Sequence, residues 1–227
     1  MGMVQKTPNG ESLVPPAGQQ MKMWRFAWAA VALIVVIGAA LWGRARFAPP
    51  SLEGAVLTPP VRAYGFQLPD QDGRPVSLAA LRGRVVALTF LYTHCPDYCP
   101  LIADQINAAH AQLARLGDRV AFVAVSVDPS GDTPEAIRGF LEAHHVRGVL
   151  TYLRGTAAQL RPVWAHYFVA SDAKDGVSAG AGGGQGVNHT TIVYIIDPQG
   201  LVRVFLPANF DLKDLVTDVR LLARTAR

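Results

Sequence analysis

Two cysteines stand four positions apart and are the only cysteines in a chain of 227 residues. Cys95 and Cys99 enclose a Pro-Asp-Tyr tripeptide, and a second proline follows. Thiolates are soft ligands that select Cu(I), and they are also the nucleophiles of thiol–disulfide exchange. A small structural disulfide is the alternative, but the loop it would close is so short that the chain-entropy model predicts little stabilisation. The pair therefore predicts a site that handles a metal ion or a pair of electrons.

The cysteine pair stands at the junction of two predicted elements. Residues 85–91 form a continuous apolar run with β-branched residues, which indicates a buried strand, and residues 100–116 show helical spacing. The cysteines thus lie at the start of a helix, whose dipole stabilises a thiolate over a thiol. If the loop between them is helix-like, side chains at i and i+4 point the same way, so the two sulfurs can share one ion.

Strand and helix patterns alternate through the rest of the chain. We predict strands over residues 64–68, 75–78, 85–91, 120–127, 149–153, 190–196 and 201–206, and helices over residues 100–116, 133–145, 156–167 and 211–222. This order resembles the thioredoxin-like arrangement, an α/β fold with a central mixed sheet flanked by helices. Functional groups of such sheets lie beyond the carboxyl ends of the parallel strands, which is where the cysteines are placed.

The N-terminal part of the chain has a different character. Residues 1–22 are polar and lack periodicity, which predicts a disordered tail. Residues 23–43 are almost entirely apolar, with tryptophans near both ends, and their length is close to the roughly 20 residues of a transmembrane helix. A cleaved signal peptide is the alternative, but its apolar region normally runs only about 7–15 residues, so we favour an uncleaved anchor. Residues 44–60 predict an extended linker, which leaves residues 61–227 for the folded domain.

Composition narrows the classes of function. Half of the residues are apolar and 17% are charged, so a core can form. The net charge of +4 comes from scattered arginines rather than from a basic run interleaved with aromatics, which argues against a nucleic-acid partner. All four methionines precede or enter the predicted anchor, so a thioether-based copper site in the domain is excluded.

Three segments together resemble the SCO/SenC family. They are residues 92–100 (Tyr-Thr-His-Cys-Pro-Asp-Tyr-Cys-Pro), residues 125–129 (Val-Ser-Val-Asp-Pro) with 132–134 (Asp-Thr-Pro), and residues 188–191 (Asn-His-Thr-Thr). Members of that family are membrane-anchored copper-binding proteins that assist the assembly of cytochrome c oxidase. The resemblance implies Cys95, Cys99 and His189 as copper ligands. It also implies two partners, a copper donor protein and a copper-binding subunit of the oxidase.

The residues themselves support His189 as the third ligand. If strand 190–196 runs antiparallel to strand 85–91, its amino end lies beside the carboxyl end of the other, and His189 directly precedes it. An isolated loop histidine is usually only solvated, and the glycine-rich stretch 178–186 before it is compatible with a plain surface loop. Two thiolates and one imidazole suit Cu(I) by their softness, and Zn²⁺ less exclusively.

Three other residues near the cysteines have weaker claims. His94 adjoins Cys95 but is expected to face away, so we interpret it as a structural neighbour rather than a ligand. Asp97 is expected to cap the following helix, and the alternative is that it gives the site a negative rim for a donor protein. Asp128 follows a buried strand, and the sequence leaves open whether it tunes the site or contacts a partner, or only forms a turn before Pro129.

Two hypotheses for the function remain. The first is a copper metallochaperone, which binds and delivers Cu(I), and also Cu(II), and is not an enzyme. The second is a thiol–disulfide oxidoreductase that keeps a partner's copper-site cysteines reduced. Three residues separate the cysteines, which departs from the Cys-X-X-Cys motif of redox enzymes. A peroxidase of the same fold is disfavoured, because no arginine stands beside Cys95 in the sequence. The positive charges on the two sides of the predicted anchor nearly balance, so they do not set its orientation. The copper and thiol chemistry of both hypotheses instead places the domain in the periplasm, on a single-pass inner-membrane anchor.

Overall fold

The computed structural model describes residues 28–40, 42, 51–169 and 192–224. The chain divides into two compact units, Met1–Pro50 and Ser51–Arg227. In the first unit, residues 28–40 form a helix whose residues are all exposed. Within the described residues, no helix has both the length and the apolar character needed to cross a membrane. The predicted tail and parts of the predicted anchor 23–43 lie outside the described residues.

The second unit is built on a six-stranded mixed sheet with the order β1-β8-β7-β4-β5-β6. Its strands are β1 (Ala55–Arg62), β4 (Val85–Leu91), β5 (Val120–Ser126), β6 (Leu150–Leu153), β7 (Ile192–Ile196) and β8 (Leu201–Pro207). Strands β4, β5 and β6 are parallel, whereas β7 runs antiparallel to β4 and β8, and β1 runs antiparallel to β8. A separate hairpin is formed by β2 (Gln67–Pro69) and β3 (Pro75–Ser77). The prediction of a mixed sheet is confirmed.

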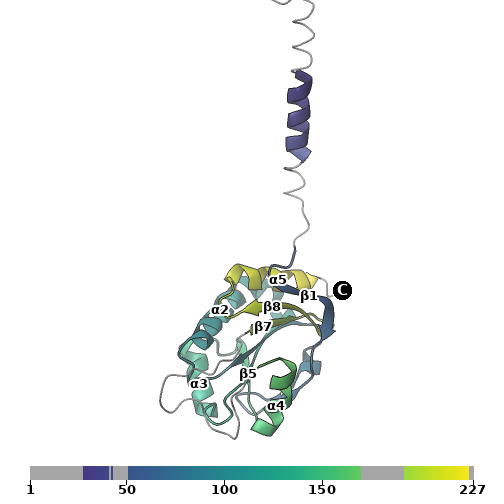
Figure 1. Ribbon diagram of the computed structural model, residues 1–227. Helices are drawn as coiled ribbons and strands as arrows, with labels where there is room; N and C mark the ends of the chain where they lie inside the picture. The colour runs from purple at the N-terminus through teal and green to yellow at the C-terminus, as the bar shows by residue number, and fades with distance from the viewer. Residues whose placement is uncertain (1–27, 41, 43–50, 170–191, 225–227) are drawn as a thin grey trace, which may run out of the picture. The chain divides into compact units, whose positions relative to one another are not determined.

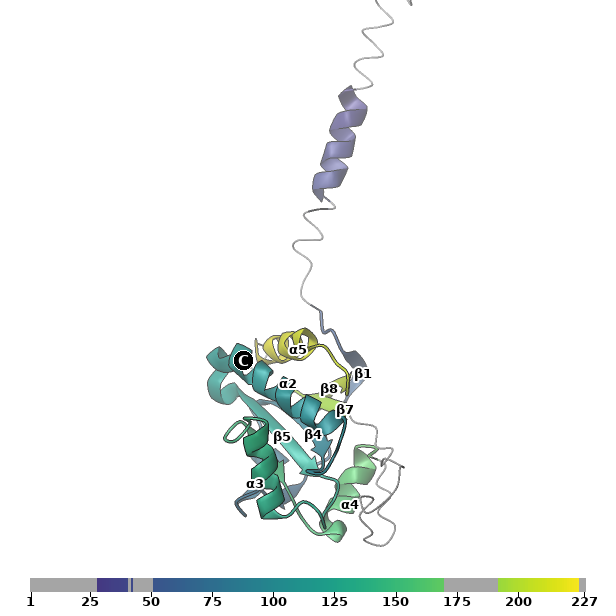
Figure 2. The same cartoon turned by 90° about the vertical axis from the view of Figure 1, so that its left-hand side faces the viewer.

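Helices cover both faces of this sheet (Figures 1 and 2). They are α2 (Tyr98–Leu113), α3 (Pro134–Ala143), α4 (Ala157–His166) and α5 (Leu212–Arg224), with 3₁₀ turns at η1 (Leu78–Leu81) and η2 (Ala114–Arg119). All of β4 is buried, and its side chains alternate between two apolar clusters. One cluster holds residues of α2, α3 and α5, and the other holds residues of α4 and the β2–β3 hairpin.

Strand β1 corrects the predicted linker. The sequence predicts an extended linker over residues 44–60, but Ala55–Arg62 pairs with β8 and belongs to the sheet. Its two prolines are tolerated because β1 is an edge strand, and the pairing register shifts between Val56 and Val61, on either side of them. The preceding backbone is also held, since the N–H groups of Glu53 and Gly54 donate to Asp218 of α5 at 2.7 and 3.1 Å.

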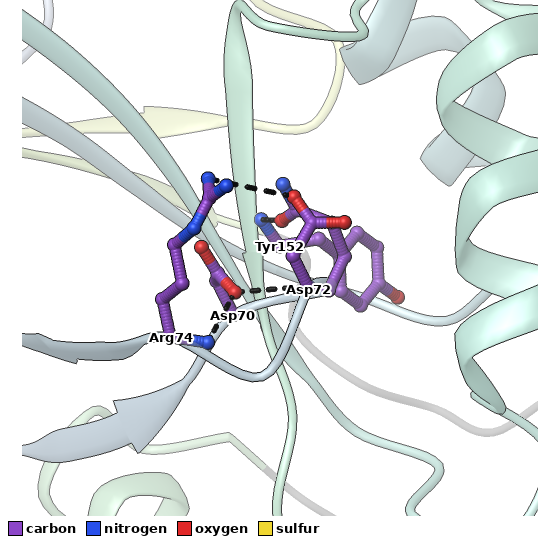
Figure 3. A network of polar contacts seen from close by, with 5 residues as sticks. Asp70, Asp72, Arg74 and Tyr152 are labelled. Atoms are coloured by element: carbon purple, nitrogen blue, oxygen red, sulfur yellow. Dashed lines mark hydrogen bonds and ion pairs between the residues drawn. The ribbon is translucent and has the colours of Figure 1, made fainter.

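The opposite edge of the sheet is covered by the turn of the β2–β3 hairpin. The N–H of Tyr152 in β6 donates to Oε1 of Gln71 at 3.0 Å, and the N–H of Arg154 donates to the carbonyl of Pro69 at 2.9 Å. Within the turn, Asp70 accepts from the backbone N–H groups of Asp72 and Arg74 at 2.9 and 2.8 Å (Figure 3). This cover protects the β6 edge from pairing with another chain, and it fixes Tyr152, whose hydroxyl reaches the cysteine site.

Candidate metal centre

The two cysteines lie where strand β4 passes into helix α2. Cys95 is in the connecting loop and is 8% exposed, whereas Cys99 is the second residue of α2 and is fully buried. The two sulfurs are not joined as a disulfide. The backbone N–H of Cys99 donates to Sγ of Cys95 at 3.5 Å, so the Cys95 sulfur lies at the positive end of the helix dipole. The predicted placement of the pair, after a buried strand and at a helix N-terminus, is confirmed.

The thiols interact directly with each other. A hydrogen bond with Cys95 raises the pKa of the Cys99 thiol far above its ordinary value, and burial raises it further. Cys99 therefore keeps its proton and donates it toward the Cys95 sulfur. Because a metal ion binds the thiolate rather than the thiol, loading this pair must release protons.

Asp132 links the cysteine loop to the neighbouring strands. This carboxylate is only 2% exposed, and it accepts hydrogen bonds from the N–H and hydroxyl of Thr93 at 2.8 and 2.9 Å. It also accepts from Ser126 at the end of β5 and from Tyr152 of β6, at 2.5 and 3.0 Å. Burial raises the pKa of the Asp132 carboxyl. One side chain thus fixes the loop two residues before Cys95.

Sequence reasoning gave Asp132 no role, although the residue was part of the motif that carried the family resemblance. The available signal was its position between the end of strand β5 and Thr133, the N-cap of α3. That position lies at the same sheet edge as the cysteine loop, because β4 and β5 are parallel. Its contact with Thr93, 39 positions away in the chain, is not encoded in any local pattern.

The structure places His94, Asp97 and Asp128, the weaker candidates near the cysteines, in three different environments. His94 is exposed, and its Nδ1 lies 3.1 Å from the hydroxyl of Thr93. Asp97 occupies the N-cap position of α2 but makes no capping hydrogen bond through its side chain, so its predicted capping role is wrong. The exposed loop leaves that carboxylate free to turn toward solvent. Asp128 accepts from the N–H groups of Ser130 and Gly131 at 3.2 and 3.0 Å, which favours the turn-forming alternative.

His189 lies outside the described residues, as do the glycine-rich stretch 178–186 and the first two residues of the predicted strand 190–196. Among the residues that the structure describes, no group of three or more His, Cys, Asp or Glu side chains is placed to hold a metal ion. The described part of the site therefore consists of two sulfur donors and the side chains that position them.

We expect Asp132→Ala to lower the free energy of unfolding by about 1–3 kcal/mol, because the buried groups that donate hydrogen bonds to Asp132 lose their acceptor. Copper affinity should fall about 10–100-fold, as is typical when a group that supports a ligand is lost. Asp132→Asn should lose less, since it keeps an acceptor for Thr93, and Ser130→Ala in the neighbouring exposed turn should behave like the wild type. The measurements are chemical unfolding and competition against a Cu(I) chelator.

The Asp132 variants should also differ from the wild type in how the free energy of unfolding depends on pH. The folded-state pKa of Asp132 is raised above the unfolded one, so the folded chain binds more protons between the two values. Its contribution to stability is lost as the pH rises through the folded-state pKa. Asp132→Asn should lack this dependence, and an unchanged pH profile of stability would contradict the assignment.

Comparison with known proteins identifies the family. A family model described as SCO1/SenC matches residues 59–224. The chain belongs to the SCO1/SenC family. It is similar to the mitochondrial protein SCO2 of Saccharomyces cerevisiae, with 29% identity over 161 residues that cover 66% of this chain and 51% of the relative. The chain thus spans about half the length of that relative.

Two further relatives relate the SCO1/SenC fold to copper. A protein of Stutzerimonas stutzeri named a putative copper-binding protein is 27% identical over 155 residues, which cover 66% of this chain and 71% of that protein. The solved structure of Bradyrhizobium japonicum ScoI with copper bound has a TM-score of 0.59 and 27% identity, and the match covers 71% of this chain and 99% of that one. The predicted family resemblance is confirmed, and the fold matches that of copper-loaded relatives.

Proposed function

We propose that this chain is a copper metallochaperone that binds copper through Cys95, Cys99 and His189 and delivers it to a copper-binding subunit of cytochrome c oxidase. The observation that carries the proposal is the pair of adjacent thiols, joined by a hydrogen bond and set at the N-terminus of α2. Two soft sulfur donors fit Cu(I), and an imidazole would complete a three-coordinate site that can also accommodate Cu(II). Membership of the SCO1/SenC family supports copper as the cargo.

The register of strand β7 supports His189 as the third ligand. Strand β7 runs antiparallel to β4, and the hydroxyl of Thr89 donates to the carbonyl of Ile192 at 3.3 Å. Ile192, the first residue of β7, therefore lies near the end of β4 from which the cysteine loop departs. His189 precedes Ile192 by only three positions in the sequence. An imidazole in the segment before β7 needs only a short span of chain to reach the sulfurs.

Delivery requires that a partner can approach the metal. Helix α2 and the core cover Cys99 fully, whereas Cys95 retains some exposure. Pro96 and Asp97 between the cysteines are exposed, and Leu101 in the first turns of α2 is 42% exposed despite being apolar. A copper ion held here would be shielded on the α2 side and open on the loop side, from which a donor protein or an oxidase subunit could exchange ligands with it.

We also propose that the first unit anchors the protein in the inner membrane, with the copper domain on the periplasmic side. The support is the uncharged apolar run 26–42 in the sequence, together with the exposure of every residue in helix 28–40. A helix that presents apolar side chains in all directions requires an apolar environment.

The alternative function is that of a thiol–disulfide oxidoreductase. It is favoured by one observation, the convergence of hydrogen bonds from Cys99 on the Cys95 sulfur, which is the arrangement that activates a nucleophilic thiolate. The partner's disulfide would take up two electrons and two protons from the Cys95–Cys99 pair, which would itself become a disulfide. The copper site requires the reduced pair, so the two functions compete for the same sulfurs.

The proposal is tested by titrating the reduced, purified full chain with Cu(I). We expect one copper per chain, because two thiolates and one imidazole form a single site and the chain has no other cysteine. Fully oxidised protein, with the pair joined as a disulfide, is the matched control and should bind no tight copper. A reduced protein that binds no tight copper, or a ratio near two copper ions per monomer, would contradict the proposal.

A further inference from the structure

Tyr92 forms hydrogen bonds with both cysteines, with Cys95 through its side chain and with Cys99 through its backbone. It is the first residue after strand β4, and its side-chain hydroxyl forms a hydrogen bond with Cys95. Its backbone also hydrogen-bonds with the Cys99 thiol, and its carbonyl accepts from the N–H of Cys95 at 3.3 Å. A single residue thus contacts both sulfurs and also closes the turn that leads to Cys95.

The ring of Tyr92 is held in place by packing. The side chain is partly buried, and it packs against both apolar clusters, one on each face of the sheet. A phenol hydroxyl carries its proton at neutral pH, so the Tyr92 hydroxyl is available as the donor in its hydrogen bond with Cys95. A hydrogen bond from a ring held by packing is preorganised, so less entropy is lost when it forms.

Donors that converge on one sulfur favour its electron-rich form. The Cys95 sulfur accepts from the backbone N–H of Cys99 at 3.5 Å, and it also forms hydrogen bonds with the side chains of Cys99 and Tyr92. Such donors stabilise a thiolate, but they gain little from the neutral sulfur of a disulfide. They also draw electron density away from the sulfur, which makes it a weaker donor to a bound metal ion.

We propose that Tyr92 is a positioning residue of the dithiol whose hydroxyl sets the reduction potential of the Cys95–Cys99 pair and the donor strength of the Cys95 sulfur toward copper. The inference deepens the proposed function and rests on it for copper only. The potential of the pair is a property of the copper-free protein, so the two proposals can fail independently.

The test compares Tyr92→Phe with Tyr98→Phe. The first substitution removes only the hydroxyl and keeps the packed ring. The second makes the same chemical change at a tyrosine that lies between the two cysteines but is 50% exposed. The copper-free full chain is equilibrated in buffers of reduced and oxidised glutathione at one pH, and the disulfide fraction is counted after alkylation. Each reduced chain that becomes a disulfide transfers two electrons and two protons to glutathione disulfide, which gives two molecules of glutathione.

Tyr92→Phe should move the dithiol–disulfide equilibrium about tenfold toward the disulfide, because the reduced form loses a hydrogen bond. For this two-electron couple, a tenfold change corresponds to about 30 mV toward a more reducing potential. Tyr98→Phe should leave the equilibrium within about twofold of the wild type, since it removes no contact with a sulfur. An unchanged equilibrium in Tyr92→Phe, or an equal shift in both variants, would overturn the inference.

A second measurement reads the donor strength of the sulfur directly. In the Cu(II)-loaded full chain, Tyr92→Phe should move the sulfur-to-copper charge-transfer band to lower energy, because the Cys95 sulfur becomes a stronger donor. Tyr98→Phe should leave the band in place. A band that does not move in Tyr92→Phe would refute the part of the inference that concerns copper. If the wild type binds no copper, the proposed function fails, and the glutathione equilibrium alone decides the role of Tyr92.

Discussion

Replacing Cys95 or Cys99 by serine is expected to abolish tight copper binding while leaving the domain folded. A hydroxyl is a hard, protonated oxygen and does not replace a soft thiolate toward Cu(I). The affinity should fall by more than about a hundredfold, which exceeds the loss typical of removing an outer supporting group. Folding should survive because no disulfide joins the two cysteines, so no cross-link is lost.

Competition against a Cu(I) chelator measures the affinity, and far-UV circular dichroism with chemical unfolding measures the fold. The double variant Cys95→Ser/Cys99→Ser is the matched control. Its copper affinity should be little lower than that of either single variant, because two ligands of one ion act as a unit and their losses do not add. If either single serine variant failed to fold, the pair would have a structural role, and the proposed metal site would be wrong.

His189→Ala is expected to separate delivery of copper from disulfide exchange. Cu(II) prefers sites with nitrogen ligands and higher coordination, so Cu(II) binding should be lost. Two sulfurs can still bind Cu(I) in a linear geometry, so Cu(I) affinity should weaken only partly. Copper transfer to an oxidase subunit should fail, whereas disulfide exchange by the cysteine pair should persist, because the thiols and the helix N-terminus are unchanged.

His94→Ala is the matched control for this prediction. His94 adjoins Cys95 in the sequence, but its side chain is exposed, so its removal should leave both Cu(II) and Cu(I) binding near the wild type. The decisive measurement is oxidase assembly at low copper in cells that carry each variant. If His189→Ala supported assembly while a cysteine variant did not, the protein would act as a thiol reductase, and the metallochaperone proposal would be wrong.

Elements whose causes are local could be predicted from the sequence. The mostly apolar run of Val85–Leu91 is the observed strand β4, because a strand buried on both faces is apolar at nearly every position. Thr133 is an observed N-cap whose hydroxyl accepts from Ala136, since a cap depends only on residues three positions away. The position of the cysteine pair between β4 and α2 followed from these neighbours.

Other features depend on partners that are distant in the sequence. The prolines of β1 argue against a strand, and only the open edge of β8 makes one possible there. The carboxylate of Asp132 became part of the site only because the parallel pairing of β4 with β5 brings two chain segments to one edge of the sheet.

The chemistry of this protein follows from its residues, which are a pair of soft thiols at a helix N-terminus in a chain of the SCO1/SenC family. The contacts that hold the cysteine loop in place depend on the tertiary structure. The hydrogen bond from Thr93 to Asp132 requires two atoms to lie within about 3 Å of each other, and that proximity is set by strand pairing and core packing across the domain rather than by the residues adjacent in the chain.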